Sequence, residues 1–293
     1  IAGGEPLIHP EIDKIVSGMI LRKKPVYLCT NDLLLEKNLH KFKPSPYLIF
    51  SVHLDGVEKT HDRMVCQQGV YKTAISAIKL AKSLGFCVMT NSTIFQGEDV
   101  AEFREFFDQN MAMGLDGMMI SPGYAYEKAP EQQLFLKQEQ SKAWFKEALK
   151  DWRTKGWAFN HSPFYMDFLE GKRTYDCTPW GNPLRNVFGW QRPCYLMNEG
   201  GYAKTYGELL STTDWSKYGH ASGNPKCLNC MTHCGFEPTS VSDSFSSISS
   251  FFEMVADFAS IKAPKKVSLS YDRNGTYEEV LEKAQPKEPA GKA

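Results

Sequence analysis

The sequence predicts an α/β fold, because short apolar segments of strand length alternate with longer segments of helical periodicity. Glycine or proline separates neighbouring segments, and polar residues follow the end of each predicted strand. The alternation repeats five times within residues 1–156, and strands connected through helices run parallel. These observations predict a partial parallel (β/α) barrel of the TIM type that lacks its first strand–helix unit. A loop-rich C-terminal domain that contains cysteines is expected to follow it.

The individual elements follow from the same periodicity and from the residues at their ends. Pro10 suits a first helical turn, while Gly85 and Gly114 suit the left-handed residue that ends a helix. We expect strands over residues 25–30, 47–56, 86–94 and 117–124, and helices over residues 10–24, 31–42, 70–84, 99–113, 131–155 and 241–262. The predicted domains are residues 1–156 and 157–262, followed by a mostly disordered, Lys/Pro/Ala/Gly-rich tail at residues 263–293.

The opening stretch, Ile1-Ala-Gly-Gly-Glu-Pro6, is typical of a strand that ends abruptly in a turn. Gly3 and Gly4 let a ligand approach the backbone, and Pro6 ends strand pairing because it lacks an N–H group. Backbone carbonyls and the Glu5 carboxylate would then suit an ammonium group, although a tight turn with nothing bound is the alternative. Because the chain starts with Ile1 inside this predicted strand, we expect that N-terminal sequence is missing.

Composition narrows the class of protein. The 293 residues contain 34 basic and 34 acidic side chains, so no excess of positive charge favours a nucleic-acid partner. No apolar run approaches the roughly 18 residues that span a bilayer, and no signal peptide is visible. Eight cysteines in a chain of this length indicate metal ligands rather than a disulfide framework, which predicts a reducing, cytoplasmic location.

The predicted strand ends share hydroxyl, amide, carboxylate or thiol groups, as a polar ligand lying across a barrel mouth requires. These ends are Gly3-Gly-Glu-Pro6, Cys29-Thr-Asn31, Ser51-Val-His-Leu-Asp-Gly56, Thr90-Asn-Ser-Thr93 and Ser121-Pro-Gly-Tyr124. The set resembles the radical S-adenosylmethionine (SAM) superfamily, in which a Gly-Gly-Glu-Pro motif ends the second strand and holds the SAM amino group. The Ser-x-x-Leu-Asp-Gly ending, with His61-Asp-Arg63 just after it, resembles the fourth strand of that superfamily.

The resemblance implies SAM-binding roles for residues at these ends. Gly3, Gly4 and Glu5 would face the methionine amino group, while Ser51 and Asp55 would bond the methionine carboxylate or the ribose hydroxyls. Asn91 and Thr93 would line the ribose side, and the backbone from Ser121 to Tyr124 would flank the adenine. For Asp55 a structural alternative stays open, because Asp-Gly is a common turn signal.

The Cys-x-x-x-Cys-x-x-Cys motif that ligates the SAM-cleaving [4Fe–4S] cluster in this superfamily is not in the sequence. The resemblance places that motif upstream of Ile1. The sequence as given is therefore expected to be inactive alone.

Further blocks extend the resemblance over roughly residues 1–240. They are Val26-Tyr-Leu-Cys-Thr-Asn31, Lys43-Pro-Ser-Pro-Tyr47, Ser51-Val-His-Leu-Asp-Gly56, Ile120-Ser-Pro-Gly-Tyr-Ala-Tyr-Glu127, Cys177-Thr-Pro-Trp-Gly-Asn-Pro183, Asn186-Val-Phe-Gly-Trp-Gln-Arg-Pro-Cys-Tyr195 and Cys230-Met-Thr-His-Cys-Gly235. Together they resemble the adenosyl-hopene transferase (adenosylhopane synthase) family, which adds the 5′-deoxyadenosyl radical to the terminal alkene of a C30 hopene (diploptene). The resemblance implies a transferase of hopanoid biosynthesis, with flavodoxin or ferredoxin as electron donor and contact with a membrane surface.

Adding a primary radical to a terminal alkene leaves a tertiary carbon radical that needs a hydrogen atom, and a thiol is the natural donor. Cys29 is the only cysteine at a predicted C-terminal strand end of the barrel, so we predict that it quenches the product radical. The alternative is a small buried core residue, as free cysteine often is. Aromatic residues of the second domain would either line a site for the lipid or form core: Phe159, Phe164, Tyr165, Phe168, Trp180, Phe188 and Trp190.

The C-terminal cysteines form a second candidate site. Cys177 and Cys194 precede Cys227-x-x-Cys230, and four thiolates suit a structural Zn²⁺ or a second [4Fe–4S] cluster. Their spacing resembles the shortened auxiliary-cluster units that follow some radical SAM barrels. Cys234 is an alternative ligand and His233 a further option, and buried thiols without metal are the remaining possibility.

Two other functions compete with the hopene transferase. One is a radical SAM enzyme that modifies a peptide and carries an auxiliary cluster, although no recognition domain for a leader peptide is visible. The other is a binding module in which a barrel is stapled by zinc.

Overall fold

The structure, a computed structural model, describes residues 1–126, 129–197 and 199–264. The predicted disordered tail lies outside these residues, apart from its first two positions. The described chain divides into two compact units. The first contains Ile1–Ser92 and Glu105–Met119, and the second contains Thr93–Arg104 and Ile120–Ala263. The predicted domain boundary at residue 156 stays a prediction.

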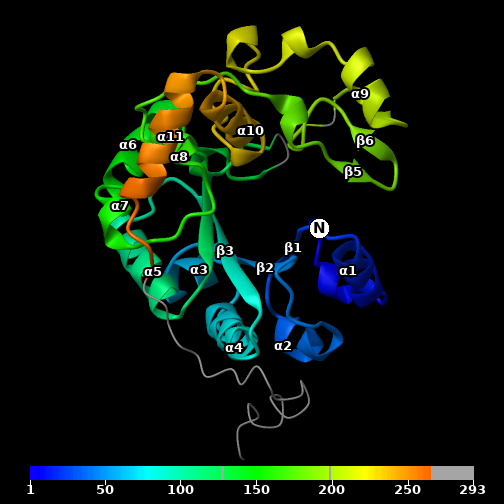
Figure 1. Cartoon of the computed structure of the whole chain (residues 1–293), viewed down its shortest axis with the longest axis vertical. Helices are drawn as coiled ribbons and strands as arrows, with labels where there is room; N and C mark the ends of the chain where they lie inside the picture. The colour runs from blue at the N-terminus through cyan, green and yellow to red at the C-terminus, as the bar shows by residue number, and fades with distance from the viewer. Residues whose placement is uncertain (127–128, 198, 265–293) are drawn as a thin grey trace, which may run out of the picture. The chain divides into compact units, whose positions relative to one another are not determined.

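A four-stranded sheet confirms the predicted α/β class. Its strands are β1 (Val26–Thr30), β2 (Leu48–His53), β3 (Cys87–Ile94) and β4 (Gly117–Pro122), in the order β1-β2-β3-β4. The β1–β2 and β2–β3 pairs are parallel, and Figure 1 shows these strands side by side. Ile1 is not in a strand element, but it exchanges two backbone hydrogen bonds with β1, as a parallel partner would: its N donates to Tyr27 O (2.6 Å) and its O accepts from Cys29 N (3.0 Å).

The two faces of this sheet differ in burial. Leu28, Phe50 and Val88 lie in register on one face and are fully buried. On the opposite face, which we call the open face, Cys29 and Asn91 are half-buried. Adjacent residues of parallel strands point to the same side, and the side alternates along each strand. The open face is therefore where strand residues of the first unit are accessible.

Between residues 31 and 69, the helices of the first unit differ from the predicted ones. They are η1 (Pro6–Ile8), α1 (Ile12–Leu21), α2 (Leu35–Asn38), η2 (Leu39–Lys41), α3 (Glu58–Met64) and α4 (Val70–Ser83), and α5 (Val100–Ala112) is shared with the second unit. The expected helix at 31–42 is two short pieces, and α3 occupies an expected loop. Asp62 of α3 accepts hydrogen bonds from Gly69 N (2.6 Å) and Tyr71 N (2.9 Å), so it joins α3 to the start of α4. Such a connection leaves no periodic signal in the sequence.

The second unit is built mainly from short helices and irregular segments. They are η3 (Gln132–Leu134), α6 (Gln138–Ala148), α7 (Trp152–Lys155), α8 (Pro163–Leu169), η4 (Pro179–Gly181), α9 (Tyr206–Thr212), η5 (Trp215–Lys217), η6 (His220–Ser222), α10 (His233–Ser244) and α11 (Ile248–Ser260), with a small antiparallel sheet of β5 (Arg185–Asn186), β6 (Gly189–Gln191) and β7 (Tyr202–Ala203). The single helix expected over residues 131–155 was wrong. Asp151 has a left-handed φ of 61°, which interrupts the helical path between α6 and α7. Helices α8, α10 and α11 pack together (Figure 1).

Helix α11 has one anchored side and one exposed side. Glu253 pairs with Arg173, and Asp257 lies 3.6 Å from Arg153 Nη2, so these carboxylates hold the helix to the unit. The exposed side, which we call the apolar face of α11, consists of Ile248 (79% exposed), Phe251, Phe252 (65%), Val255 and Phe258. Among the described helices, none combines the length and the apolar character that crossing a bilayer would require.

Candidate functional site

The predicted glycine turn lies beside β1 and is open. Gly3 and Gly4 have φ values of 99° and 57°, a region that residues with a Cβ rarely adopt. A Cβ on either residue would meet nothing within 4 Å, and both residues are exposed. A ligand can therefore reach this backbone closely, as SAM binding requires.

The Glu5 carboxylate has partners of its own. It accepts hydrogen bonds from Thr30 Oγ1 (3.0 Å), Asn31 N (2.8 Å) and Leu7 N (3.0 Å). These bonds fix the glycine turn to the end of β1, so Glu5 shapes the turn. Its predicted contact with an amino group stays a prediction.

Asp32 is a residue of this region that the sequence analysis treated only as part of a helix start. Its side chain is fully buried, and no hydrogen bond reaches its carboxylate oxygens among the described residues. Burial, and then the nearby negative charge of Glu5, raise the pKa of the Asp32 carboxyl well above its usual value.

Cys29 and Ser51 are paired in register on the open face. Cys29 is half-buried, whereas Ser51 is buried. Asn91 is on the same face, in register with His53 on β2. The structure thus brings three predicted residues of the first unit to one side of one sheet, near its C-terminal edge. Their roles toward SAM or a product radical stay predictions.

The predicted residue Asp55 is buried and bonded to a histidine that sequence reasoning missed. His53 Nε2 lies 2.8 Å from Asp55 Oδ2, and Asp55 N donates to His61 Nδ1 at 3.1 Å. Burial lowers the pKa of His53, but the hydrogen bond and the charge of Asp55 outweigh it and raise that pKa. The His53 side chain is 41% exposed, so it is the accessible member of the pair. Its position two residues after Ser51, on the same strand face, is the signal that would have identified it.

Two other predicted SAM-site residues, Thr93 and Ser121, belong to the second unit. Ser121 is buried. Tyr124, at the end of the same predicted segment, lines a pocket together with cysteines rather than standing alone at a strand end. The roles of Thr93 and Ser121 stay predictions.

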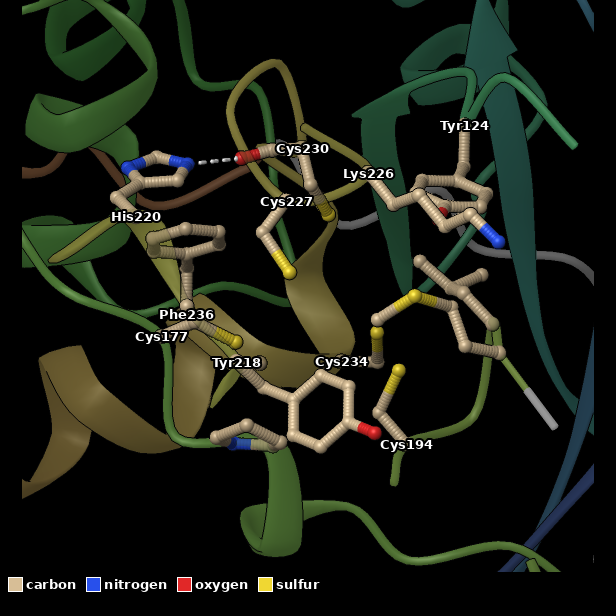
Figure 2. A pocket seen from close by; sticks show the side chains of 15 residues that line it. Tyr124, Cys177, Cys194, Tyr218, His220, Lys226, Cys227, Cys230, Cys234 and Phe236 are labelled. Atoms are coloured by element: carbon tan, nitrogen blue, oxygen red, sulfur yellow. Dashed lines mark hydrogen bonds between the residues drawn. The ribbon is translucent and has the colours of Figure 1, made fainter. Parts of the chain in front are cut away.

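All five C-terminal cysteines line one pocket of the second unit, which we call the thiol pocket. They are Cys177, Cys194, Cys227, Cys230 and Cys234. Figure 2 shows their side chains reaching one hollow from separate segments, with Tyr124, Tyr218 and Phe236 around them. All five are free thiols. The structure thus brings together the four expected ligands Cys177, Cys194, Cys227 and Cys230, with the alternative Cys234 beside them, and their binding of a metal stays a prediction.

Gln191 shapes the loop that carries Cys194. Its buried side-chain amide donates to the carbonyls of Cys194 (3.0 Å), Tyr195 (3.1 Å) and Met197 (2.9 Å). The carbonyls are thereby drawn to Gln191, while the backbone N–H groups of Leu196 and Met197 donate to the Cys194 sulfur.

The other thiols are also held by specific contacts. Backbone N–H groups of Gly219 and Thr232 donate to the sulfurs of Cys227 and Cys230, respectively. His220 Nε2 lies 2.7 Å from the Cys230 carbonyl. The Cys177 sulfur lies directly against Gly235, where a Cβ would collide with it. Thr178 N, next in the chain, donates to Gly235 O at 3.1 Å.

Burial is the main cause of the raised pKa values of these thiols. It raises the pKa of Cys177, and it raises the pKa of Cys230 to about 11, in both cases with smaller contributions from neighbouring thiols. No three His, Cys, Asp or Glu side chains of the described residues are arranged to hold a single metal ion. His233 does not line the pocket, and burial followed by His161 lowers its pKa to about 4.

The aromatic residues proposed as lipid lining separate into two groups. Phe164, Tyr165 and Phe168 of α8 are fully buried and form core, as the structural alternative held. Phe188 is 73% exposed and Trp180 is 38% exposed. Phe159 and Trp190 are half-buried.

The fold and the strand-end residues define an α/β protein with a parallel sheet and an open, glycine-lined turn at the edge of that sheet. Residues 1–109 match the model of the radical SAM superfamily. Residues 118–254 match a domain of unknown function (DUF3463).

Curated relatives are similar to part of the chain, and a solved structure is similar to it in fold. The chain is 29% identical over 111 residues to GTP 3′,8-cyclase of Aliarcobacter butzleri, covering 36% of this chain and 34% of the relative. It is 26% identical over 120 residues to probable GTP 3′,8-cyclase of Aeropyrum pernix, covering 41% of this chain and 34% of the relative. The chain thus spans about a third of the length of these relatives. Its fold is similar to that of anSMEcpe with bound AdoMet, with a TM-score of 0.52, 14% identity, and coverage of 90% of this chain and 84% of that one.

Proposed function

We propose that the protein is a radical SAM transferase that adds the 5′-deoxyadenosyl group to the terminal alkene of a hopene. The observation that carries the proposal is the position of one thiol within the part of the chain that matches the radical SAM superfamily. Cys29 lies on the open face of β1, and its N–H is bonded to Ile1, two residues before the glycine turn, within residues that match the radical SAM superfamily. The motif blocks that resemble adenosyl-hopene transferases support the choice of lipid.

The residues at the strand ends fit SAM in part. Gly3 and Gly4 leave their backbone open to a charged ligand, and Ser51, Asn91 and the exposed His53 ring offer polar groups on the same sheet. The Cys-x-x-x-Cys-x-x-Cys motif for the SAM-cleaving cluster is not among the 293 residues. The proposal for this chain therefore concerns binding, orientation and hydrogen transfer.

SAM held at this site and reduced by one electron from a ferredoxin or flavodoxin would break its sulfur–C5′ bond, release methionine and supply the 5′-deoxyadenosyl radical for addition to the alkene. Cys29 then gives its hydrogen atom to the tertiary carbon radical of the adduct, which forms a C–H bond and leaves a thiyl radical at Sγ. One further electron from the same class of donor, with a proton, restores the thiol. The half-buried position of Cys29 suits this role because its side chain is partly shielded but still accessible.

The apolar face of α11 is the surface that we propose for membrane contact. Its five large apolar side chains are exposed and carry no charge. The exposed Lys262 follows the helix, and Lys265 and Lys266 come next in the sequence. An apolar helix face flanked by lysines complements a bilayer surface with anionic lipids, where a C30 hydrocarbon substrate dissolves.

The membrane contact is tested with vesicles that contain anionic lipid. The double variant Ile248→Ser with Phe252→Ser should weaken binding by roughly tenfold, because it removes two apolar side chains from the inserted surface. Leu21→Ser is the matched control, since Leu21 is 83% exposed but lies outside this face. Dimerisation of the protein without vesicle binding would contradict the proposal.

The transferase proposal is tested by turnover. Enzyme purified with its SAM-cleaving cluster, given SAM, a reductant and diploptene, should form adenosylhopane, detected by mass spectrometry. SAM cleavage without any lipid adduct, or modification of a peptide instead, would overturn it.

A further inference from the structure

We propose that His53 is the proton donor that restores the Cys29 thiol after each turnover. This role rests on the hydrogen-atom transfer proposed for Cys29. One electron reduces the thiyl radical at Sγ to a thiolate, and the His53 imidazolium then gives that sulfur a proton. The neutral imidazole takes up a proton from solvent, so both side chains return to their starting forms.

The first argument is the position of His53 on the sheet. Cys29 of β1 is paired with Ser51 of β2, and His53 follows Ser51 by two residues, so all three lie on the open face. Neighbouring strands lie about 4.8 Å apart and rise about 3.3 Å per residue, which puts the Cα atoms of Cys29 and His53 roughly 8 Å apart. The thiol and the imidazole can then exchange a proton through the Ser51 hydroxyl or a water molecule between them.

The second argument is the way Asp55 holds His53. His53 Nε2 lies 2.8 Å from Asp55 Oδ2, and the Asp55 side chain is 4% exposed, whereas that of His53 is 41% exposed. A buried carboxylate that accepts this hydrogen bond fixes the ring and favours its protonated form. The exposed part of the ring can take up a proton from solvent. His53 therefore has both an orienting partner and a supply of protons.

The third argument is the contrast with His61, the other histidine beside Asp55. His61 Nδ1 accepts the Asp55 N–H at 3.1 Å, so its ring is neutral and carries its proton on Nε2. Burial is the main cause of the lowered pKa of His61, whereas at His53 burial is outweighed by the hydrogen bond and the charge of Asp55, and the pKa is raised. Neighbouring groups whose pKa values move apart are typical of sites that transfer protons. His61 thus positions Asp55, and His53 carries the proton.

The groups around His53 show what controls its protonation. Asp55 follows β2, and His61 belongs to α3, with its ring centre 5.8 Å from that of His53. The register partner of His53 on β3 is Asn91, which does not titrate. Glu5 lies past the end of β1, where it accepts hydrogen bonds of its own. Asp55 is therefore the main influence on the charge of His53.

The pairing of His53 with Cys29 can be tested without turnover, on the 293-residue chain. A nearby imidazolium favours the thiolate, so His53→Gln should slow the reaction of Cys29 with iodoacetamide at neutral pH by roughly two- to fivefold. Peptide mass spectrometry follows Cys29 separately from the other cysteines. His40→Gln is the matched control, since His40 is exposed and lies in η2. An unchanged rate in His53→Gln would overturn the proposal.

Turnover separates a proton donor from a structural residue. In enzyme that holds its SAM-cleaving cluster, the first turnover uses a thiol that already carries its hydrogen. His53→Gln should therefore slow later turnovers about tenfold more than the first, and added imidazole should restore them. Later turnovers of the original enzyme should also slow as pH rises through the raised pKa of His53, and the variant should lack this decline.

The outcomes distinguish this role from the proposed function. If His53→Gln slows the first and later turnovers equally, His53 acts through ligand binding or the fold, and the proton role is overturned. If later turnovers keep their original rate while adduct still forms, the proton role alone is wrong. If the original enzyme forms no adduct, the proposed function fails, and the role of His53 fails with it.

Discussion

The strand-end site and the thiol pocket both contain cysteine, but the chain places the sulfur differently in each. Cys29 is on a regular strand, half-buried, with an open sheet face before it. The thiols of the pocket come from irregular segments, and most accept N–H hydrogen bonds. A reachable thiol near the C-terminal edge of the sheet suits the transfer of a hydrogen atom, whereas several fixed sulfurs around one hollow suit a bound metal centre.

The largest effect is expected when the thiol of the strand-end site, Cys29, is removed. Cys29→Ala should lower formation of the saturated adduct by about a hundredfold, equivalent to about 2.7 kcal/mol, because the carbon radical loses its hydrogen donor. SAM cleavage, measured as 5′-deoxyadenosine, should continue. Product analysis by mass spectrometry in deuterated buffer would follow both.

Cys87→Ala provides the matched control for that experiment. Cys87 starts β3 and is also half-buried, but it lies four residues before Asn91, away from the C-terminal edge of the sheet. Its removal should leave the product unchanged. If the two variants behave alike, the position of Cys29 has no special role.

A smaller effect, on stability, is expected at Gly235 beside the thiol pocket. Gly235→Ala should destabilise the protein by roughly 1–3 kcal/mol, because the added methyl group collides with the Cys177 sulfur. Gly207→Ala in α9 is the control. Its Cβ would meet only Thr205 Oγ1, at 4.0 Å, and alanine favours a helix. Urea unfolding followed by circular dichroism measures the stability of both variants. Equal changes in the free energy of unfolding would show that the pocket makes room for the added methyl group.

The smallest effect concerns Asp32 near the strand-end site. Its folded pKa is raised, by burial first and then by Glu5, so the folded state binds the proton more tightly than the unfolded state. Stability should therefore fall as pH rises from the unfolded pKa, near 3.8, toward the higher folded pKa. Asp32→Asn should remove this decline and increase stability at neutral pH, as thermal unfolding across pH would show. Asn also tolerates the φ of 64° at this position. A variant with the pH profile of the original chain would contradict the assignment.

Much of the first unit could be predicted because its strands repeat a local pattern. The apolar runs that became β1 to β4 were recognised, and parallel order then placed Cys29, Ser51 and Asn91 on one sheet. The partners of Glu5 and Asp55 could not be predicted, since Thr30 and His53 reach them through the fold. Position alone does not say which polar groups bind each other.

The second unit was less predictable for a physical reason. Its segments are held by side chains acting on distant backbone, as Gln191 does for the Cys194 loop, and this leaves no period in the sequence. The helix expected at 131–155 is interrupted twice, by the extended backbone of Phe135 and Lys137 and by the left-handed φ of Asp151. Cys177, Cys194, Cys227 and Cys230 were expected to form one candidate site, but the contacts that bring their segments to one pocket depend on the tertiary fold.

The three carbonyls that accept hydrogen bonds from Gln191 have a consequence for the order of the loop that carries Cys194. Because that amide already sets the course of residues 194–197, the segment gains little order when its sulfur finds a partner. The loop should therefore resist proteases even when nothing is bound in the thiol pocket. Any ligand of the Cys194 sulfur would thus meet a loop that is already ordered.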